Sequence, residues 1–158
     1  MRSEPARDAD RISIRRVLNA PCKQVFEAWT RPELMARWFF AGEGWTTKVS
    51  ADVRVGGRYE LTMRDPSGEE HRQFGEYREI VPVTRLVFTW SFAPLAVVDS
   101  VVTVELVDRG ATTALNLTHV LPPDPKIRRS HEEGWTGCLR NLDLFVNQEP
   151  QELKGEST

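Results

Sequence analysis

The feature that most constrains the fold is a long run of strand-like segments between two helical regions. From Trp45 to His119, apolar residues recur at every second position within segments that are separated by turn residues. This spacing predicts strands with one buried face. The turn compositions DPSG at 65–68 and RGAT at 109–112 are typical of hairpins. We therefore expect an α+β protein built on an antiparallel sheet of about six to seven strands.

One strand and two short helices are expected before this run, and one long helix after it. In the strand at 11–18 the apolar residues Ile12 and Ile14 alternate, and then the parity shifts to Val17, which predicts a bulge. Segments 19–30 and 31–40 are predicted as short helices, each with a proline in its first turn. A final helix is expected from Lys126 to Asn147. At 1.5 Å per residue it reaches about 33 Å, close to the roughly 29 Å width of six strands, so it can cross a whole sheet face.

Length and composition indicate a single globular domain. The chain has 158 residues and a net charge of -2, which gives no reason to expect nucleic-acid binding. Segment 1–10 is predicted as a disordered leader, 11–149 as the domain and 150–158 as a flexible tail. Because there is no apolar signal segment and no run long enough to span a membrane, a cytoplasmic location is expected. Two cysteines suggest neither a disulfide framework nor a zinc site. A homodimer is left open.

The final helix carries glycine where helices normally do not. Gly134 lies midway along the apolar stripe, beside the small Cys138 and next to Trp135. Each glycine inside a helix costs roughly 1 kcal/mol relative to alanine. The helix face therefore has a central notch. Either a bulky sheet residue fills it, which is the default for a close-packed interior, or it roofs a cavity.

Five motifs, taken together, resemble those of a known family. They are APxxxVFxAWTxPExxxxWF at 20–39, DxRVGGxY at 52–59, GxYxEIxPxxRLVFTW at 75–90, TxLxLxH at 113–119 and HxxGWxxCLxxL at 131–142. In this order they resemble the heat-shock-protein-90 ATPase activator homologue family of the START-like, helix-grip superfamily, also called SRPBCC. The resemblance implies a curved antiparallel sheet gripping a long C-terminal helix, with a pocket between them, and so favours the cavity over the filled notch.

The resemblance implies a hydrophobic ligand pocket between the concave sheet face and the helix. Its expected members are Trp38, Phe39 and Trp45 at the mouth, Tyr59, Leu61, Met63, Tyr77, Phe88, Trp90, Leu115, Leu117 and His119 on the sheet, and His131, Gly134, Trp135 and Cys138 on the helix. Apolar walls with a few polar groups are typical of small-molecule sites. The expected partner is an apolar or amphipathic small molecule.

Two other functions are kept open by the resemblance. A chaperone-interacting, ATPase-activator-like protein is doubtful, because the eukaryotic co-chaperone that names the family has this fold as only one part. A cyclase- or hydrolase-type enzyme would need His119, His131 or Tyr77 to face bound substrate.

The candidate chemical groups also have simpler structural interpretations. Each histidine is better explained as a half-buried residue bonded to a backbone carbonyl or lying at the solvent edge. Cys138 on an apolar stripe is better explained as an inert core thiol than as a nucleophile. No catalytic set, metal site or cofactor is predicted.

Overall fold

The computed structural model describes residues 11–40, 42–93 and 97–157, and these form seven strands and three helices. The elements, in chain order, are β1 (Arg11–Leu18), α1 (Cys22–Thr30), α2 (Pro32–Trp38), β2 (Thr46–Ala51), β3 (Arg58–Arg64), β4 (Glu70–Val81), β5 (Arg85–Ala93), β6 (Val97–Arg109), β7 (Thr112–Val120) and α3 (Pro125–Ser157). This is the predicted order of a strand, two short helices, a strand meander and a long helix. The expected leader, 1–10, lies outside the described residues.

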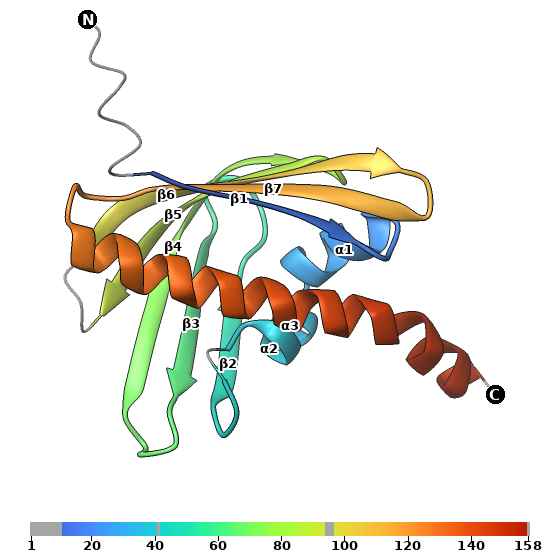
Figure 1. Cartoon of the computed structure of the whole chain (residues 1–158), viewed down its shortest axis with the longest axis horizontal. Helices are drawn as coiled ribbons and strands as arrows, with labels where there is room; N and C mark the ends of the chain where they lie inside the picture. Colours follow the sequence, from blue (N-terminus) through green and yellow to red (C-terminus); the bar gives the residue numbers. More distant parts are fainter. Residues whose placement is uncertain (1–10, 41, 94–96, 158) are drawn as a thin grey trace, which may run out of the picture.

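All seven strands belong to one antiparallel sheet in the order β1-β7-β6-β5-β4-β3-β2. The meander from β2 to β7 follows the chain, and β1 adds to β7 at the far edge. Register shifts interrupt the pairing between Tyr77 and Glu79 on β4 and between Trp90 and Phe92 on β5. Such irregularities increase the local twist and bend of a sheet. The sheet curls strongly, and α3 runs across it (Figure 1), as the α+β helix-grip prediction required.

The predicted bulge in the first strand is wrong. The ladder between β1 and β7 runs without interruption from Arg11 opposite Val120 to Leu18 opposite Thr113. Leu18 is fully buried and continues the inner face of Ile12, whereas Val17 is 59% exposed on the outer face. The reason is that Arg16 occupies an inner-parity position near the strand end. Because Val17 is the next apolar residue after Ile14, the sequence suggested that the inward-facing positions shift by one residue. The strand makes no such shift.

The long helix α3 buries the predicted stripe against the sheet. Its buried residues include His131, Trp135, Cys138, Leu142 and Val146, at the spacing of one helical face. Asp124 caps the start, because its Oδ1 accepts from the backbone N–H of Lys126 at 2.9 Å. The helix continues to Ser157, well past the expected end at Asn147. It thus runs through most of the expected tail, 150–158, and passes both Pro150 and Gly155.

The two short helices close one end of the sheet and bring tryptophans into the core. Trp29 on α1 and Trp38 on α2 meet edge to face with ring centroids 4.7 Å apart. The indole N–H of Trp38 donates to the carbonyl of Ala28 at 2.9 Å, which fixes α2 against α1. Among the described helices, none combines the length and apolarity needed to cross a bilayer.

Candidate functional site

A cavity of about 330 Å³ lies between the curled sheet and α3. Its walls come from the α2–β2 connection, from strands β3, β4 and β5, and from one face of α3. The residues that line it are Phe39, Trp45, Met63, His71, Gln73, Trp90, Phe92, Ser130, His131, Gly134, Trp135 and Cys138. The surface is therefore mainly aromatic, with few polar side chains. This is the composition expected of a small-molecule site.

Gly134 opens the roof of this cavity. A Cβ atom placed on Gly134 would meet no heavy atom within 4 Å, so no bulky sheet residue fills the notch in the helix face. Gly134 and the neighbouring lining residue Ser130 are both exposed, and the cavity therefore reaches solvent alongside α3. Gly134 thus lines the cavity at its edge, and the space at its Cβ position is open.

The cavity has a buried end and an accessible rim. At the buried end Trp90 stacks on Phe39 with ring centroids 6.0 Å apart and packs against Trp135 at 4.9 Å. At the rim Trp45 lies 5.1 Å from the ring of His71, and both are half-buried. A ligand entering past the rim would meet aromatic faces along its whole path.

The predicted pocket residues fall into three groups. Those that line the cavity are Phe39, Trp45, Met63, Trp90, His131, Gly134, Trp135 and Cys138. Tyr59, Leu61, Tyr77 and Phe88 instead surround a separate space of about 10 Å³ under α1 and α2, together with Trp29, Met35 and Leu86, room for about one water molecule. Trp38, Leu115, Leu117 and His119 are buried and line neither space. Trp38 is thus a core residue and does not form the mouth.

Sequence reasoning missed four residues that line the cavity, namely His71, Gln73, Phe92 and Ser130. Alternation along β4 contained a usable signal, because His71 and Gln73 share the inward parity of Tyr77. Phe92 likewise continues the alternation of Phe88 and Trp90 on β5. The polar character of His71 and Gln73 concealed them, since periodicity alone does not distinguish a buried polar side chain from an outward one.

His119 is fully bonded within the core. The indole N–H of Trp135 donates to His119 Nδ1 at 2.9 Å, so this nitrogen is an acceptor. His119 Nε2 lies 2.8 Å from Ser100 Oγ, whose own hydroxyl donates to the carbonyl of Trp90 at 2.6 Å. Nε2 must therefore carry the proton, and the ring is neutral. Burial, reinforced by the neighbouring His131, lowers the pKa of His119 well below its usual value. His119 positions the cavity wall and has no bond left for a ligand.

Only one of the two ring nitrogens of His131 has a hydrogen-bond partner among the described residues. Its Nδ1 lies 3.0 Å from the carbonyl of Ile127, one turn earlier in α3, and donates to it. Its Nε2 is buried and has no hydrogen-bond partner among the described residues. Burial lowers the pKa of His131, while the bond to Ile127 acts in the opposite direction. The neutral ring therefore keeps one acceptor nitrogen buried and without a partner among the described residues.

Gln73 and Trp90 carry two more unpartnered groups on the cavity wall. Gln73 Oε1 and Trp90 Nε1 are buried and lack a hydrogen-bond partner within the described part of the chain. Gln73 is 3% exposed and Trp90 4% exposed. Buried polar groups are almost always hydrogen-bonded, and leaving one unpaired costs roughly 1–3 kcal/mol. Both groups are therefore enclosed within the wall of the cavity.

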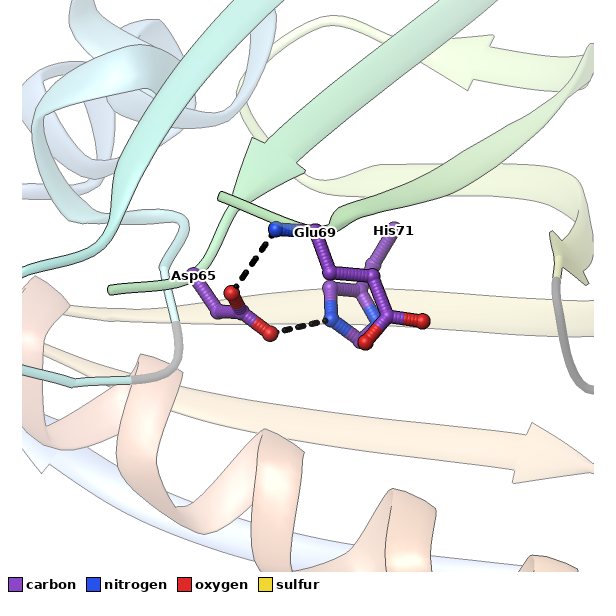
Figure 2. A group of neighbouring side chains, drawn as sticks. All are labelled: Asp65, Glu69 and His71. Atoms are coloured by element: carbon purple, nitrogen blue, oxygen red, sulfur yellow. Dashed lines mark hydrogen bonds and ion pairs between the residues drawn. The ribbon is translucent and has the colours of Figure 1, made fainter. Parts of the chain in front are cut away.

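A histidine–aspartate pair lies at the rim. His71 Nε2 and Asp65 Oδ2 are 3.1 Å apart (Figure 2). The hydrogen bonds from Ser67, followed by that from His71, lower the pKa of Asp65 to about 2. Asp65 is thus a carboxylate, and His71 Nε2 is the donor in their bond.

Asp65, Glu69 and His71 each offer one potential metal ligand atom, and these atoms lie within 4.8 Å of one another. The Asp65 carboxylate is already occupied, however. Its Oδ1 accepts from the Ser67 N–H and hydroxyl and from the Glu69 N–H, at 2.6–3.0 Å. These bonds form the turn between β3 and β4 that the DPSG composition predicted. The cluster is explained as a turn, and the expectation of no metal stays a prediction.

Cys138 has the properties of a core thiol. Its Sγ lies 3.5 Å from the carbonyl of Phe40, and burial raises the pKa of Cys138 to about 12. The thiolate is therefore absent at neutral pH, and the sulfur serves as a small apolar surface of the cavity.

A protein-family model described as "Activator of Hsp90 ATPase homolog 1-like protein" matches residues 19–147. The chain belongs to this family. The match begins just before α1, takes in the remaining six strands and extends through the cavity-lining part of α3. The resemblance inferred from the five motifs is confirmed.

Several solved structures are similar in fold to this member of the Activator of Hsp90 ATPase homolog 1-like family. Protein CV1439 from Chromobacterium violaceum is 30% identical, with a TM-score of 0.77 over 87% of this chain and 96% of that one. Mll3558 from Rhizobium loti is 29% identical, with a TM-score of 0.72 over 85% and 95%. NE0264 from Nitrosomonas europaea is 24% identical, with a TM-score of 0.76 over 90% and 97%. A comparison with curated proteins gives no match.

Proposed function

We propose that this protein binds an apolar or amphipathic small molecule in the cavity beneath α3. The observation that carries the proposal is the open space of about 330 Å³ under Gly134, walled by aromatic side chains. Small-molecule sites occupy roughly 300–1,000 Å³, so the volume suits a compact ligand. Protein interiors otherwise fill to the density of organic crystals. A glycine that keeps such a volume open in mid-helix supports a binding role.

The same family description raises chaperone interaction as an alternative. Docking on another protein generally uses a contiguous apolar patch. The large apolar side chains exposed in the described part of the chain are Val17, Val55, Val81, Val107, Val120 and Leu144. Val17 and Val107 lie in one register row on either side of Ala114, and the other four come from other parts of the chain. A pair of valines is smaller than the patches that mark docking surfaces, so ligand binding remains the better supported function.

Catalysis at the cavity has less support from the predicted residues. His119 has no free bonding position, and Tyr77 is buried beside the smaller space. Burial also raises the pKa of Tyr77, which keeps its phenol protonated. His131 and the missed His71 are the imidazoles on the cavity wall. The described partner of His131 is the Ile127 carbonyl and that of His71 is the Asp65 carboxylate, so neither is bonded to a hydroxyl or thiol in these contacts.

The binding function is tested with the substitution Gly134→Leu. The new side chain finds open space in the folded protein and would project into the cavity. We expect uptake of the neutral fluorescent dye N-phenyl-1-naphthylamine to be lost, with the circular dichroism spectrum unchanged. Thr136→Leu is the matched control, because Thr136 is an exposed residue of the same helix. It should leave dye uptake as in the wild type.

Equal dye uptake by wild type and Gly134→Leu would refute the proposed site. Native mass spectrometry of the protein purified from its own host gives a second measurement. A bound small molecule in the wild type, missing from Gly134→Leu, is the expected result.

A further inference from the structure

The wall of the cavity differs in composition from the rest of the core. Of its twelve lining residues, three are tryptophan, two are phenylalanine and two are histidine. None of the described lining residues is Val, Leu or Ile. Elsewhere in the core these aliphatic residues are common, and the smaller space under α1 and α2 is lined in part by Leu61 and Leu86. The cavity is therefore enclosed by rings to a degree that the neighbouring core is not.

The rings form one continuous series from the accessible rim to the buried end. Successive centroids are 4.9 to 6.5 Å apart, in the order Trp45, His71, Phe92, His131, Trp90 and Trp135. The cavity volume of about 330 Å³ lies near the lower end of the range for small-molecule sites. A compact ligand would therefore be next to several of these rings wherever it lies in the cavity.

Polar and charged groups contribute little to recognition at the buried end. Gln73 Oε1, Trp90 Nε1 and His131 Nε2 are enclosed within the wall, so a ligand in the cavity does not reach them. The described lining residues include no Lys, Arg, Asp or Glu. Selection between ligands of equal size must therefore come mainly from the rings.

Aromatic rings favour other aromatic rings, whichever way they are turned. The face of a ring is electrically negative and its edge is positive, so rings attract one another edge to face or in an offset stack. A saturated ring has neither feature and gains only from burial of its apolar area. A cation is attracted to ring faces alone, and any ion loses its hydration in a cavity without a counter-charge.

We propose that the cavity prefers a compact, neutral, flat aromatic molecule over a saturated molecule with the same skeleton. This proposal rests on the ligand-binding function and assigns its ligand class. Each favourable contact between two rings increases affinity by roughly two- to twelvefold beyond the effect of area. The preference should therefore grow with the number of aromatic rings in the ligand.

The test compares three alcohols of one carbon skeleton by displacement of N-phenyl-1-naphthylamine at pH 7.5. They are 2-naphthol, 5,6,7,8-tetrahydro-2-naphthol and decahydro-2-naphthol, with two, one and no aromatic rings. The dissociation constant should rise at each step, and 2-naphthol should bind at least about fivefold more tightly than the decahydro compound. Burial of apolar area alone predicts no such order, because the saturated alcohol has at least as much apolar surface.

Two charged probes test the preference for a neutral ligand. 2-Naphthoate and 2-naphthylmethylammonium keep the aromatic part of 2-naphthol and add a negative or a positive charge. Each should bind more weakly than 2-naphthol, because the wall supplies no counter-charge. Tighter binding of the ammonium would show a site for cations and would overturn the preference for a neutral molecule.

Variants at the rim assign the preference to individual rings. Phe92→Leu and Trp45→Leu each replace a half-buried ring of the wall by an aliphatic side chain. In each variant the ratio of the decahydro-2-naphthol to the 2-naphthol dissociation constant should decrease by about twofold or more. Phe74→Leu is the matched control. Phe74 is also half-buried, but it directly follows the lining residue Gln73 on β4 and so lies on the opposite face of the sheet. It should retain the wild-type ratio.

The outcomes separate the two proposals. If the dye itself does not bind, the binding function is overturned. If the dye binds but no alcohol displaces it, or the saturated alcohol binds as tightly as 2-naphthol, only the aromatic preference is overturned. An unchanged ratio in both rim variants also overturns it. Should one rim variant fail to fold, the order of the three alcohols in the wild type and the other variant still decide the question.

Discussion

His119 and His131 are adjacent, with ring centroids 5.4 Å apart, yet they have opposite roles. His119 uses both nitrogens to connect α3 to the sheet, whereas His131 uses one and leaves the other on the cavity wall. Sequence reasoning named both and expected structural bonds to carbonyls or to the solvent edge. For His131 the Ile127 carbonyl is such a bond. For His119 the partners are Ser100 and Trp135, which strand parity and helix spacing do not reveal.

These histidines predict how stability depends on pH. Burial lowers the pKa of both in the folded protein, whereas unfolded histidine has a pKa near 6.5. Below about pH 6.5 the unfolded chain therefore binds more protons, and the free energy of unfolding falls as pH decreases, by up to about 1.4 kcal/mol per pH unit for each histidine. Urea denaturation at pH 8, 6.5 and 5.5 measures this loss.

The variant His119→Gln isolates the contribution of His119 to that pH effect. The amide can accept from Trp135 and donate to Ser100 but does not titrate in this range, so the loss between pH 6.5 and 5.5 should become clearly smaller. His71→Gln is the control at a half-exposed histidine. Identical pH slopes for wild type and His119→Gln would contradict the assignment.

At the scale of elements, two glycines contribute to the site in different ways. Gly75 on β4 lies against β5, where a Cβ atom would come within 2.1 Å of the Thr89 carbonyl oxygen. That carbonyl also accepts from the Tyr59 hydroxyl. Gly134 on α3 has no neighbour within 4 Å. One glycine permits close approach of two strands, and the other keeps space open.

Alanine substitutions at these positions should have effects of opposite sign. Gly75→Ala should lower the free energy of unfolding by about 3 kcal/mol, because backbone atoms of β5 must move. Gly134→Ala should raise it by about 1 kcal/mol through helix propensity. Chemical denaturation compares the two directly. Destabilisation by Gly134→Ala would show that the open space beside α3 is absent in solution.

Much of the element pattern could be predicted from the sequence. Alternation and turn composition predicted the sheet, and a 3.6-residue period predicted the buried face of α3, because both depend on local apolar spacing. The local spacing gave a wrong prediction at Val17, where the break in apolar alternation was interpreted as a bulge. It also did not identify Gln73 as buried, because the polar side chain concealed the inward parity that Gln73 shares with Tyr77.

At the scale of the whole molecule, the cavity belongs to no single element. Trp90 and Gln73 come from the sheet, His131 and Trp135 from α3, and Phe39 from the α2–β2 connection. Sequence analysis could place the site between the two layers because the family resemblance implied a helix over a curved sheet. It placed Tyr59, Tyr77 and Phe88 in the same pocket, because shared strand parity does not show where the interior divides into two spaces.

A ligand held by both layers should stabilise the whole fold. At an N-phenyl-1-naphthylamine concentration one hundred times its dissociation constant, the free energy of unfolding should rise by about 2.7 kcal/mol. Hydrogen exchange should slow in α3 and in β4 and β5 together. Slower exchange confined to one layer would contradict a site shared between them. The Gly134→Leu variant should show neither effect.

The bonded chain from Trp135 through His119 and Ser100 to the Trp90 carbonyl begins and ends on the cavity floor. That floor is thus anchored from behind and offers an arriving molecule a rigid template. The adaptable part is the half-buried entrance formed by Trp45, His71 and Phe92. Relatives could therefore alter which compounds they admit by exchanging entrance side chains, while the anchored floor keeps its chemical preference.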